Sequence, residues 1–386
     1  MSYCINPKCP NRCNPDELEY CQACGTQLLI NNRYRLIKPL RSLSQEYVTE
    51  IFEVDDRGHL KVLKSLTKNR IKLVELFEQE VKILTYLRHP EIPQLEPNEY
   101  FTVVLNSEQK LHCLVMERIK GQNLEQWLDE NDFEPISEDL ALNWLKQLAE
   151  ILGYVHQNGF FHRDIKPSNI IQKPNGKLVL IDFGTAREIT ETVINGRTIT
   201  TVYSHGYTAP EQIEGRAVPQ SDFFALGRTL VHLLTAQRPA CFYQDYQASY
   251  QLMWRDNAPQ VSVPLADFID RLMDLSLEKR PQNAQEILRI TEQIILQLSL
   301  QRLKEIDFVT HSSLAENPEY NATIPVCAQT KSLFGSVSQE QYSGIEAILM
   351  ELIGPIAPTL LQQVRGQFLS PREFVGKISK FSQSKK

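Results

Sequence analysis

The sequence lacks any uninterrupted run of about 18 apolar residues, the length that a membrane-spanning helix needs. Its richest apolar stretch, around residues 294–303, is interrupted by Gln297 and Gln301. The N-terminal segment also lacks the apolar core of a secretory signal, because cysteine, proline, asparagine and charged residues interrupt it. We therefore expect a cytoplasmic protein that does not bind membranes.

An excess of basic charge is absent as well. The 386 residues include 41 Lys+Arg and 47 Asp+Glu, which gives a formal net charge of −6. Proteins that bind nucleic acid usually carry a basic patch or stripe, so no nucleic-acid partner is expected. At roughly 100–200 residues per domain, the length allows two or three domains, or one large domain with smaller additions.

The cysteines are distributed very unevenly along the chain. Cys21 and Cys24 have the spacing of a zinc knuckle, and Cys4 and Cys9 can supply the other two thiolates of a tetrahedral site. Cys13 is left over and could replace Cys9. Because the segment has too little apolar material to fold alone, bound zinc would be structural. Free or redox-active thiols are the alternative.

Composition divides the chain into four segments. Residues 1–29 are expected to form the four-cysteine zinc ribbon, called here the cysteine module. Residues 33–296 alternate strand-like and helix-like patterns, as in one large mixed domain. Polar residues 297–336 are expected to form a linker, and helical periodicity returns in residues 337–386, which predicts a small helical module.

Local patterns predict the elements of the large domain. Strands are expected at residues 36–37, 51–54, 60–66, 103–105, 114–116 and 178–181. Apolar residues recur at helical spacing over residues 73–87 and 145–155. Ser137 is a plausible N-cap for the second of these helices.

One charged residue lies on the apolar stripe of the first expected helix. Glu80 follows Leu73 by seven residues, which places it on the buried face. A buried carboxylate needs a partner, and Lys64 lies among apolar residues in the preceding strand. Such a pair would orient the ammonium group toward ligand phosphates. Two solvated surface charges are the alternative.

Two motifs farther along the chain indicate a family. His162-Arg163-Asp164 is followed by Lys166 and Asn169, and the sequence 178–181 leads into Asp182-Phe183-Gly184. Asp164 precedes Asn169 by five residues and Asp182 by eighteen. The motifs and their spacing resemble those of serine/threonine protein kinases over about residues 34–296.

The resemblance implies an α+β, two-lobed protein kinase fold with an N-terminal zinc ribbon and a C-terminal small helical module. The ribbon itself is similar to those attached to bacterial kinases, particularly cyanobacterial ones. ATP and Mg²⁺ are the implied cofactors, and protein Ser/Thr hydroxyls, including the chain's own, are the implied substrates. A further protein partner could bind through the ribbon or the C-terminal module.

The resemblance also implies roles for individual residues. Asp164 would accept the proton of the attacking hydroxyl, and Lys166 would lie against the γ-phosphate. Asp182 would bind the Mg²⁺ that bridges the nucleotide phosphates, and Asn169 would bind the second ion.

Nucleotide contacts are implied in the first lobe. Lys64, oriented by Glu80, would contact the phosphates. Met116 would be the gatekeeper, and the backbone of Glu117 and Ile119 would contact adenine.

Three residues match architectural positions of the family. Glu211, in Ala209-Pro210-Glu211, would form a buried ion pair with Arg280. Asp222 would hold the backbone of the catalytic loop.

The sequence departs from the family at the glycine-rich loop, whose glycines let backbone amides approach phosphates closely. The corresponding residues 41–50, called here the glycine-free loop, contain no glycine, and none occurs between Gly25 and Gly58. Weaker or differently organised nucleotide binding is expected. A pseudokinase scaffold is the alternative, but the polar catalytic residues are all present: Lys64, Glu80, Asp164, Asn169 and Asp182.

The expected activation segment carries several hydroxyl groups. Autophosphorylation near residues 198–201 would let Arg163 bind the phosphate and order the segment. Polar loop residues without a switch role are the alternative. The chain has Tyr203-Ser204-His205-Gly206-Tyr207 where the family often has Gly-Thr-Pro-Gly-Tyr, so the substrate-binding lip would be altered.

Overall fold

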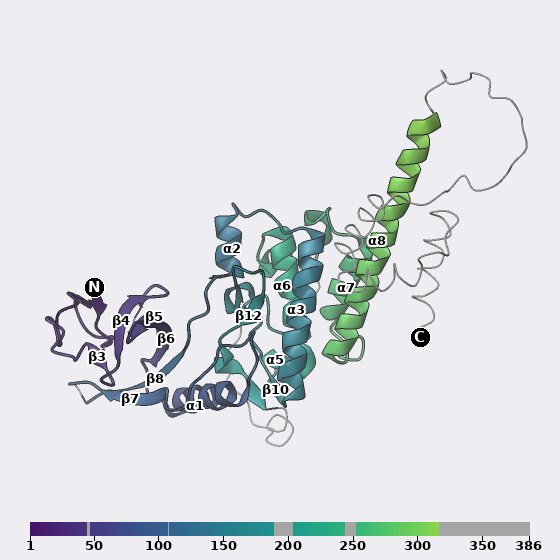
Figure 1. The fold of residues 1–386 in the computed structure, drawn as a ribbon. Helices are drawn as coiled ribbons and strands as arrows, with labels where there is room; N and C mark the ends of the chain where they lie inside the picture. Colours follow the sequence, from purple (N-terminus) through teal and green to yellow (C-terminus); the bar gives the residue numbers. More distant parts are fainter. Residues whose placement is uncertain (45–46, 107, 189–203, 244–251, 316–386) are drawn as a thin grey trace, which may run out of the picture. The chain divides into compact units, whose positions relative to one another are not determined.

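The structure is a computed structural model that describes residues 1–44, 47–106, 108–188, 204–243 and 252–315, with the backbone alone described for residues 187–188 and 303–315 (Figure 1). The chain divides into two compact units, Met1–Arg289 and Ile290–Lys386. The expected helical module, residues 337–386, and the proposed phosphorylation sites, residues 198–201, lie outside the described residues.

A six-stranded antiparallel sheet dominates the first part of the first unit, with the order β3-β4-β5-β6-β8-β7 (Figure 1). Its strands are β3 (Leu29–Ile30), β4 (Tyr34–Pro39), β5 (Thr49–Asp56), β6 (His59–Leu66), β7 (Tyr100–Val104) and β8 (Lys110–Glu117). They contain the runs predicted at residues 36–37, 51–54, 60–66 and 114–116. The run at 103–105 ends one residue early, because the backbone N–H of Leu105 donates to the carbonyl of Gln109 in the following turn.

The two faces of this sheet have different neighbours. Phe52 pairs with Leu63, while Ile51 pairs with Lys64, so these two pairs point to opposite faces. Leu63 and Phe52 belong to an apolar cluster that is completed by Ile5 of the cysteine module. The module therefore shares a core with the face of the sheet that points away from Lys64.

Helix α1 (Ile71–Tyr86) confirms the helix predicted over residues 73–87. Its buried side chains are Phe77, Glu80, Ile83 and Leu84, which recur at helical spacing. The chain leaves the helix at Leu87, whose backbone is extended.

The second part of the unit is mainly helical. Its helices are α2 (Leu124–Glu130), α3 (Glu138–Gln157), α5 (Pro210–Ile213), α6 (Pro219–Thr235) and α7 (Val263–Leu272). Ser137 caps α3 as predicted, since its hydroxyl accepts from the backbone N–H of Leu140 at 3.3 Å. Helices α3 and α6 pack together, and both carry many buried apolar residues (Figure 1).

Short strands connect these helices to the catalytic motifs. Strands β9 (Gln122–Asn123), β11 (Ile170–Gln172) and β12 (Leu178–Leu180) form a three-stranded sheet with the order β12-β11-β9. Strand β10 (Phe160–Phe161) pairs with β13 (Arg187–Glu188). The sheet-rich and helix-rich parts agree with the two-lobed fold expected from the sequence.

Helix α8 (Ala284–Ala315) begins in the first unit and ends in the second. It continues into the segment that the sequence predicts to be a linker from residue 297. No helix in the part of the chain that the structure describes is long and apolar enough to cross a membrane.

Candidate active site

The Lys64 ammonium group brings together three elements of the first unit. Its Nζ donates to both carboxylate oxygens of Glu80, at 2.8 and 2.7 Å, and to Oδ1 of Asp182 at 2.7 Å. Lys64 lies on β6, Glu80 on α1, and Asp182 directly before the 3₁₀ turn Phe183–Thr185. The Lys64–Glu80 pair predicted from the sequence is present, and Asp182 joins it.

These contacts fix the charges of the site. Lys64 is buried, which disfavours its charged form, but the carboxylates of Asp182 and Glu80 raise its pKa above the ordinary value. The Lys64 ammonium in turn holds the pKa of Asp182 well below its usual range. At neutral pH, Asp182 is therefore an anion and Lys64 a cation.

Asp182 has a left-handed backbone, with φ at 65°. This conformation is uncommon for a residue other than glycine and has to be stabilised by its surroundings. The ring of buried Phe183 packs edge-on against His162 at 4.7 Å, while the Asp182 side chain contacts Lys64. Two adjacent residues are thus each held by a side chain from another part of the unit.

The catalytic-loop motif forms a second polar group around Asp164. Lys166 Nζ donates to Oδ2 of Asp164 at 2.8 Å. Asn169 Nδ2 donates to the carbonyl of Asp164 at 2.9 Å and to its Oδ2 at 3.0 Å. The N–H of Ile181 donates to the Asn169 carbonyl at 2.9 Å, which ties this loop to the residue before Asp182. The structure thus brings the predicted catalytic residues together.

Asp222, at the start of α6, holds the backbone of this loop. It is fully buried and accepts from the N–H groups of His162, at 2.8 Å, and Arg163, at 2.6 Å. His156 Nε2 lies 2.9 Å from the same carboxylate. Since Arg163 has φ at 71°, the Asp222 bonds stabilise a left-handed turn immediately before Asp164. This is the architectural role expected for Asp222.

His162 is buried and uncharged. Burial lowers its pKa, because the charged imidazolium is poorly solvated there. Its Nδ1 accepts from the N–H of Asp164 at 3.3 Å, and its Nε2 lies 3.1 Å from the Ile181 carbonyl. A neutral imidazole protonated on Nε2 satisfies both contacts and connects Asp164 to the strand that leads to Asp182.

The predicted ion pair of the activation segment is present. Arg280 is fully buried, and two of its nitrogens donate to the Glu211 carboxylate at 2.8 and 3.0 Å. Ser221 also donates to Glu211, at 2.6 Å. Burial disfavours the charged carboxylate, but these bonds lower the pKa of Glu211 overall.

Sequence reasoning missed the contact made by Ser204. Its hydroxyl donates to Oδ1 of Asp164 at 2.6 Å, and Lys166 Nζ donates to the Ser204 oxygen at 2.8 Å. A signal was available, because Ser204 stands where the family motif Gly-Thr-Pro-Gly-Tyr has its threonine. The sequence could not indicate how close the segment that carries Ser204 lies to the loop that carries Asp164 and Lys166.

The expected adenine contacts lie at the end of β8. Glu117 is the last residue of this strand, and Ile119 is buried two residues later. Between them, Arg118 donates to Glu53 on β5. The backbone of this segment is therefore fixed to the sheet at the point where adenine is expected.

The glycine-free loop is held by side-chain interactions on both of its flanks. Arg41 donates to the hydroxyl of Thr49 at 2.9 Å, and its guanidinium lies 4.9 Å from the ring centroid of Tyr47. Thr67, just after β6, donates to the carbonyls of Tyr47 and Val48 at 2.8 and 3.0 Å. These bonds hold Arg41 and residues 47–49, on the two flanks of the loop, where the family relies on glycine.

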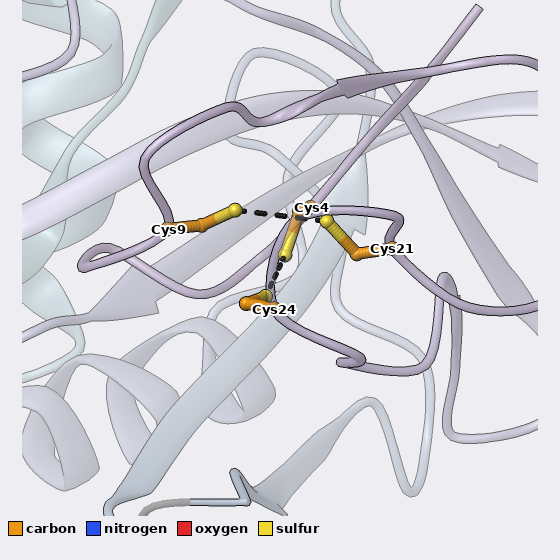
Figure 2. Close-up of side chains that lie close together, drawn as sticks. All are labelled: Cys4, Cys9, Cys21 and Cys24. Atoms are coloured by element: carbon orange, nitrogen blue, oxygen red, sulfur yellow. Dashed lines mark hydrogen bonds between the residues drawn. The ribbon is translucent and has the colours of Figure 1, made fainter.

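The four cysteines predicted as metal ligands point toward one another (Figure 2). The sulfur atoms of Cys4, Cys9, Cys21 and Cys24 all lie within 4.8 Å of one another. Cys13 is exposed and lies outside this cluster, which contains Cys9 instead. Strands β1 (Ser2–Tyr3) and β2 (Cys13–Asn14) pair beside the cluster.

Comparisons with known proteins agree with this geometry. A family model described as the protein kinase domain matches residues 48–291. Serine/threonine-protein kinase B of Synechocystis sp. is 32% identical over 308 residues, which cover 76% of this chain and 52% of that protein. Serine/threonine-protein kinase PknA of Nostoc sp. is 34% identical over 274 residues, which cover 67% and 47%.

A further relative, serine/threonine-protein kinase C of Synechocystis sp., is 37% identical over 262 residues, or 63% of this chain and 46% of that protein. The chain thus spans about half the length of the curated relatives it matches. The matched family domain covers well over half of the chain and includes both catalytic motifs. The chain therefore belongs to the protein kinase family.

Proposed function

We propose that the protein is a serine/threonine kinase that transfers the γ-phosphate of ATP to protein hydroxyls, including its own. The observation that carries this proposal is the contact of Lys64 with both Glu80 and Asp182, at 2.7 to 2.8 Å. In kinases this arrangement accompanies a site that can position nucleotide and metal. The names of the bacterial relatives support the same substrate class.

Phosphoryl transfer depends on positioning and charge neutralisation more than on covalent chemistry. The carboxylate of Asp182 and the amide oxygen of Asn169 would hold Mg²⁺, which neutralises charge on the phosphates when it is bound. Lys64 would bind the phosphates near the metal. Asp164 would accept the hydroxyl proton, and Lys166 would contact the transferred group.

The backbone of Glu117 and Ile119 would bind adenine. Glu117 ends β8, and its N–H already donates to the carbonyl of Gln94 at 3.0 Å. The carbonyl of Glu117 and the N–H of Ile119 would then be the groups that face the adenine edge. This matches the use of backbone groups by other members of the family.

The four-cysteine cluster fits a structural Zn²⁺ ion. Four sulfur atoms within 4.8 Å of one another form the all-sulfur set that tetrahedral zinc prefers. Burial raises the pKa of Cys9 to about 11, so its thiolate requires a nearby positive charge. The proposed zinc ligands are Cys4, Cys9, Cys21 and Cys24.

A kinase-shaped scaffold is the competing function, and the absence of glycine in residues 41–50 favours it. The complete set of polar residues outweighs this departure. A scaffold would have no need for Lys166 and Asn169 to hold the carboxylate of Asp164.

Labelled γ-phosphate tests the proposal. The purified chain is incubated with Mg²⁺-ATP and a generic Ser/Thr protein substrate, with Asp182→Ala in parallel. Incorporation by the wild-type chain alone, on serine or threonine, is the expected result. No incorporation by the wild-type chain at any nucleotide concentration, with zinc bound and Mg²⁺ present, would favour the scaffold.

A further inference from the structure

Arg12 connects the cysteine module to the nucleotide-binding part of the sheet. It lies between Cys9 and Cys13 in sequence, and its two terminal nitrogens donate to the two oxygens of Glu50 at 2.8 and 2.9 Å. The side chains of Arg12 and Glu50 are only 10% and 3% exposed. A buried, bidentate pair of this kind is strong and geometrically specific.

The position of Arg12 is set by the cysteine cluster. Its Nε donates to the carbonyl of Cys4 at 2.8 Å, and its own carbonyl accepts from the N–H of Cys4 at the same distance. The Arg12 carbonyl also accepts from the side chain of Asn14 at 3.1 Å. Three hydrogen bonds to Cys4 and Asn14 thus hold Arg12 in the module, and one of them, to the Cys4 carbonyl, comes from the guanidinium itself.

Glu50 stands where the glycine-free loop enters β5. The next residue, Ile51, pairs with Lys64 of β6. Glu50 is therefore the neighbour in sequence of the residue that lies opposite the proposed phosphate-binding lysine. Because side chains alternate along a strand, Glu50 points to the opposite face, where the module packs. Arg12 therefore fixes one end of the loop without contacting the nucleotide side of the sheet.

The other flank of the loop contacts the same core. Leu43 packs against the apolar cluster that contains Ile5 of the module and Phe52 of β5. The guanidinium of Arg12 lies over the Phe52 ring, 5.3 Å from its centroid. Both ends of the glycine-free loop are thus attached to a core to which the cysteine module contributes.

We propose that Arg12 is a positioning residue for the nucleotide site: through Glu50 it fixes residues 47–50 and the start of β5 beside the strand that carries Lys64. Glycine-rich loops adapt to phosphates through a permissive backbone, whereas a loop without glycine would depend on preorganisation by its contacts, both within the loop and outside it. The proposal rests on the proposed ATP-binding function and assigns the cysteine module a part in it.

The test uses the full chain with zinc bound and four variants: Arg12→Met, Glu50→Gln, the double variant, and Lys8→Met. Arg12→Met keeps an apolar stem of similar length over Phe52. Lys8 is an exposed cation of the same module, so its variant is the matched control. The measurements are the Kd of Mg²⁺-ATP, kcat and KM for ATP, bound zinc, and amide hydrogen exchange of residues 47–52 without nucleotide.

Each single substitution is expected to raise the Kd and KM for ATP by about tenfold and to accelerate exchange of residues 47–52. The double variant should bind Mg²⁺-ATP no more weakly than the weaker-binding single variant, because the two substitutions remove the same Arg12–Glu50 interaction. The kcat at saturating ATP should change little, which separates positioning of the loop from general damage. Lys8→Met should behave as the wild type.

The proposal is overturned if both single variants bind Mg²⁺-ATP within about twofold of the wild type, or if exchange of residues 47–52 is unchanged. If Arg12→Met loses zinc, the result for Glu50→Gln alone decides whether the proposal stands, because Glu50 lies outside the cysteine module. If the wild-type chain binds no ATP, the proposed function fails, but hydrogen exchange still shows whether Arg12 holds the loop.

Discussion

The hydroxyl of Ser204 donates a 2.6 Å hydrogen bond to Oδ1 of Asp164, the residue proposed to accept the substrate proton. Lys166 donates to the oxygen of Ser204 at 2.8 Å and to the other carboxylate oxygen of Asp164, also at 2.8 Å. The three polar groups form a closed ring. Ser204 therefore fixes the orientation of the Asp164 carboxylate relative to Lys166.

Ser204→Ala should lower kcat by about tenfold or more, because the Asp164 carboxylate loses one of the bonds that orient it. Ser204→Thr keeps the hydroxyl and should retain most of the activity. Steady-state phosphate transfer to a generic protein substrate checks both variants. Equal rates for Ser204→Ala and Ser204→Thr would show that the hydrogen bond does not position Asp164 during the reaction.

Glu80→Gln should lower phosphate transfer by about a hundredfold, since Lys64 loses one of its two charged partners and its position toward the phosphates. Glu75 lies on the same helix but is exposed and pairs with Lys72. Glu75→Gln is therefore the matched control and should keep wild-type activity. A Glu80→Gln variant as active as Glu75→Gln would remove the proposed role of the Lys64–Glu80 pair.

Glu211→Gln should destabilise the protein at pH 7 by about 3 kcal/mol, because Arg280 is left as a buried charge without an anionic partner. The folded-state pKa of Glu211 lies below its ordinary value of 4.5. The ionised carboxylate therefore contributes stability above this pH, and the contribution is lost as the pH falls through the folded-state pKa. The difference between wild type and Glu211→Gln should shrink in acid.

Urea unfolding at pH 7 and in progressively more acidic buffers measures this difference. Glu214→Gln is the control, because Glu214 and its partner Arg216 are exposed on the surface. Its effect should stay within about 1 kcal/mol. A gap between wild type and Glu211→Gln that does not change with pH would mean that the charge of Glu211 is not what stabilises the pair.

Cys4→Ser should abolish stoichiometric zinc binding and lower the thermal midpoint of the first unit, since one ligand of the cluster is lost. Cys13→Ser should bind as much zinc as the wild type, because Cys13 is exposed and outside the cluster. Native mass spectrometry measures the bound metal. Retention of zinc by Cys4→Ser together with its loss in Cys13→Ser would reverse the assignment of ligands.

The sequence predicted well those features that depend on the spacing of residues close together in the chain. Glu80 interrupts an apolar helical stripe, which indicated a buried partner such as Lys64, and the catalytic motifs farther along the chain favoured this over two solvated surface charges. The cysteine spacing likewise indicated the cluster, although the choice between Cys9 and Cys13 required the structure. In each case a few residues close together in the sequence were enough for the prediction, because a helix has a fixed period and a zinc knuckle has a fixed cysteine spacing.

Contacts between distant segments were not predictable in the same way. Arg12 and Glu50 are 38 residues apart, and each taken alone is an ordinary charged residue. Only the packing of the cysteine module on the far face of the sheet brings them together. The end of the long helix α8 was also missed, because its polar continuation beyond residue 297 lacks the apolar stripe that marks a packed helix.

The proposed mechanism depends on the Asp164 carboxylate, which accepts a proton during phosphate transfer. The most direct measurement compares wild type and Asp164→Asn for transfer of labelled γ-phosphate and, in the same samples, for the Kd of Mg²⁺-ATP. Asp164→Asn is expected to bind nucleotide within about threefold of wild type but to transfer phosphate at least about a hundredfold more slowly. Equal transfer by the two proteins would contradict the role of Asp164.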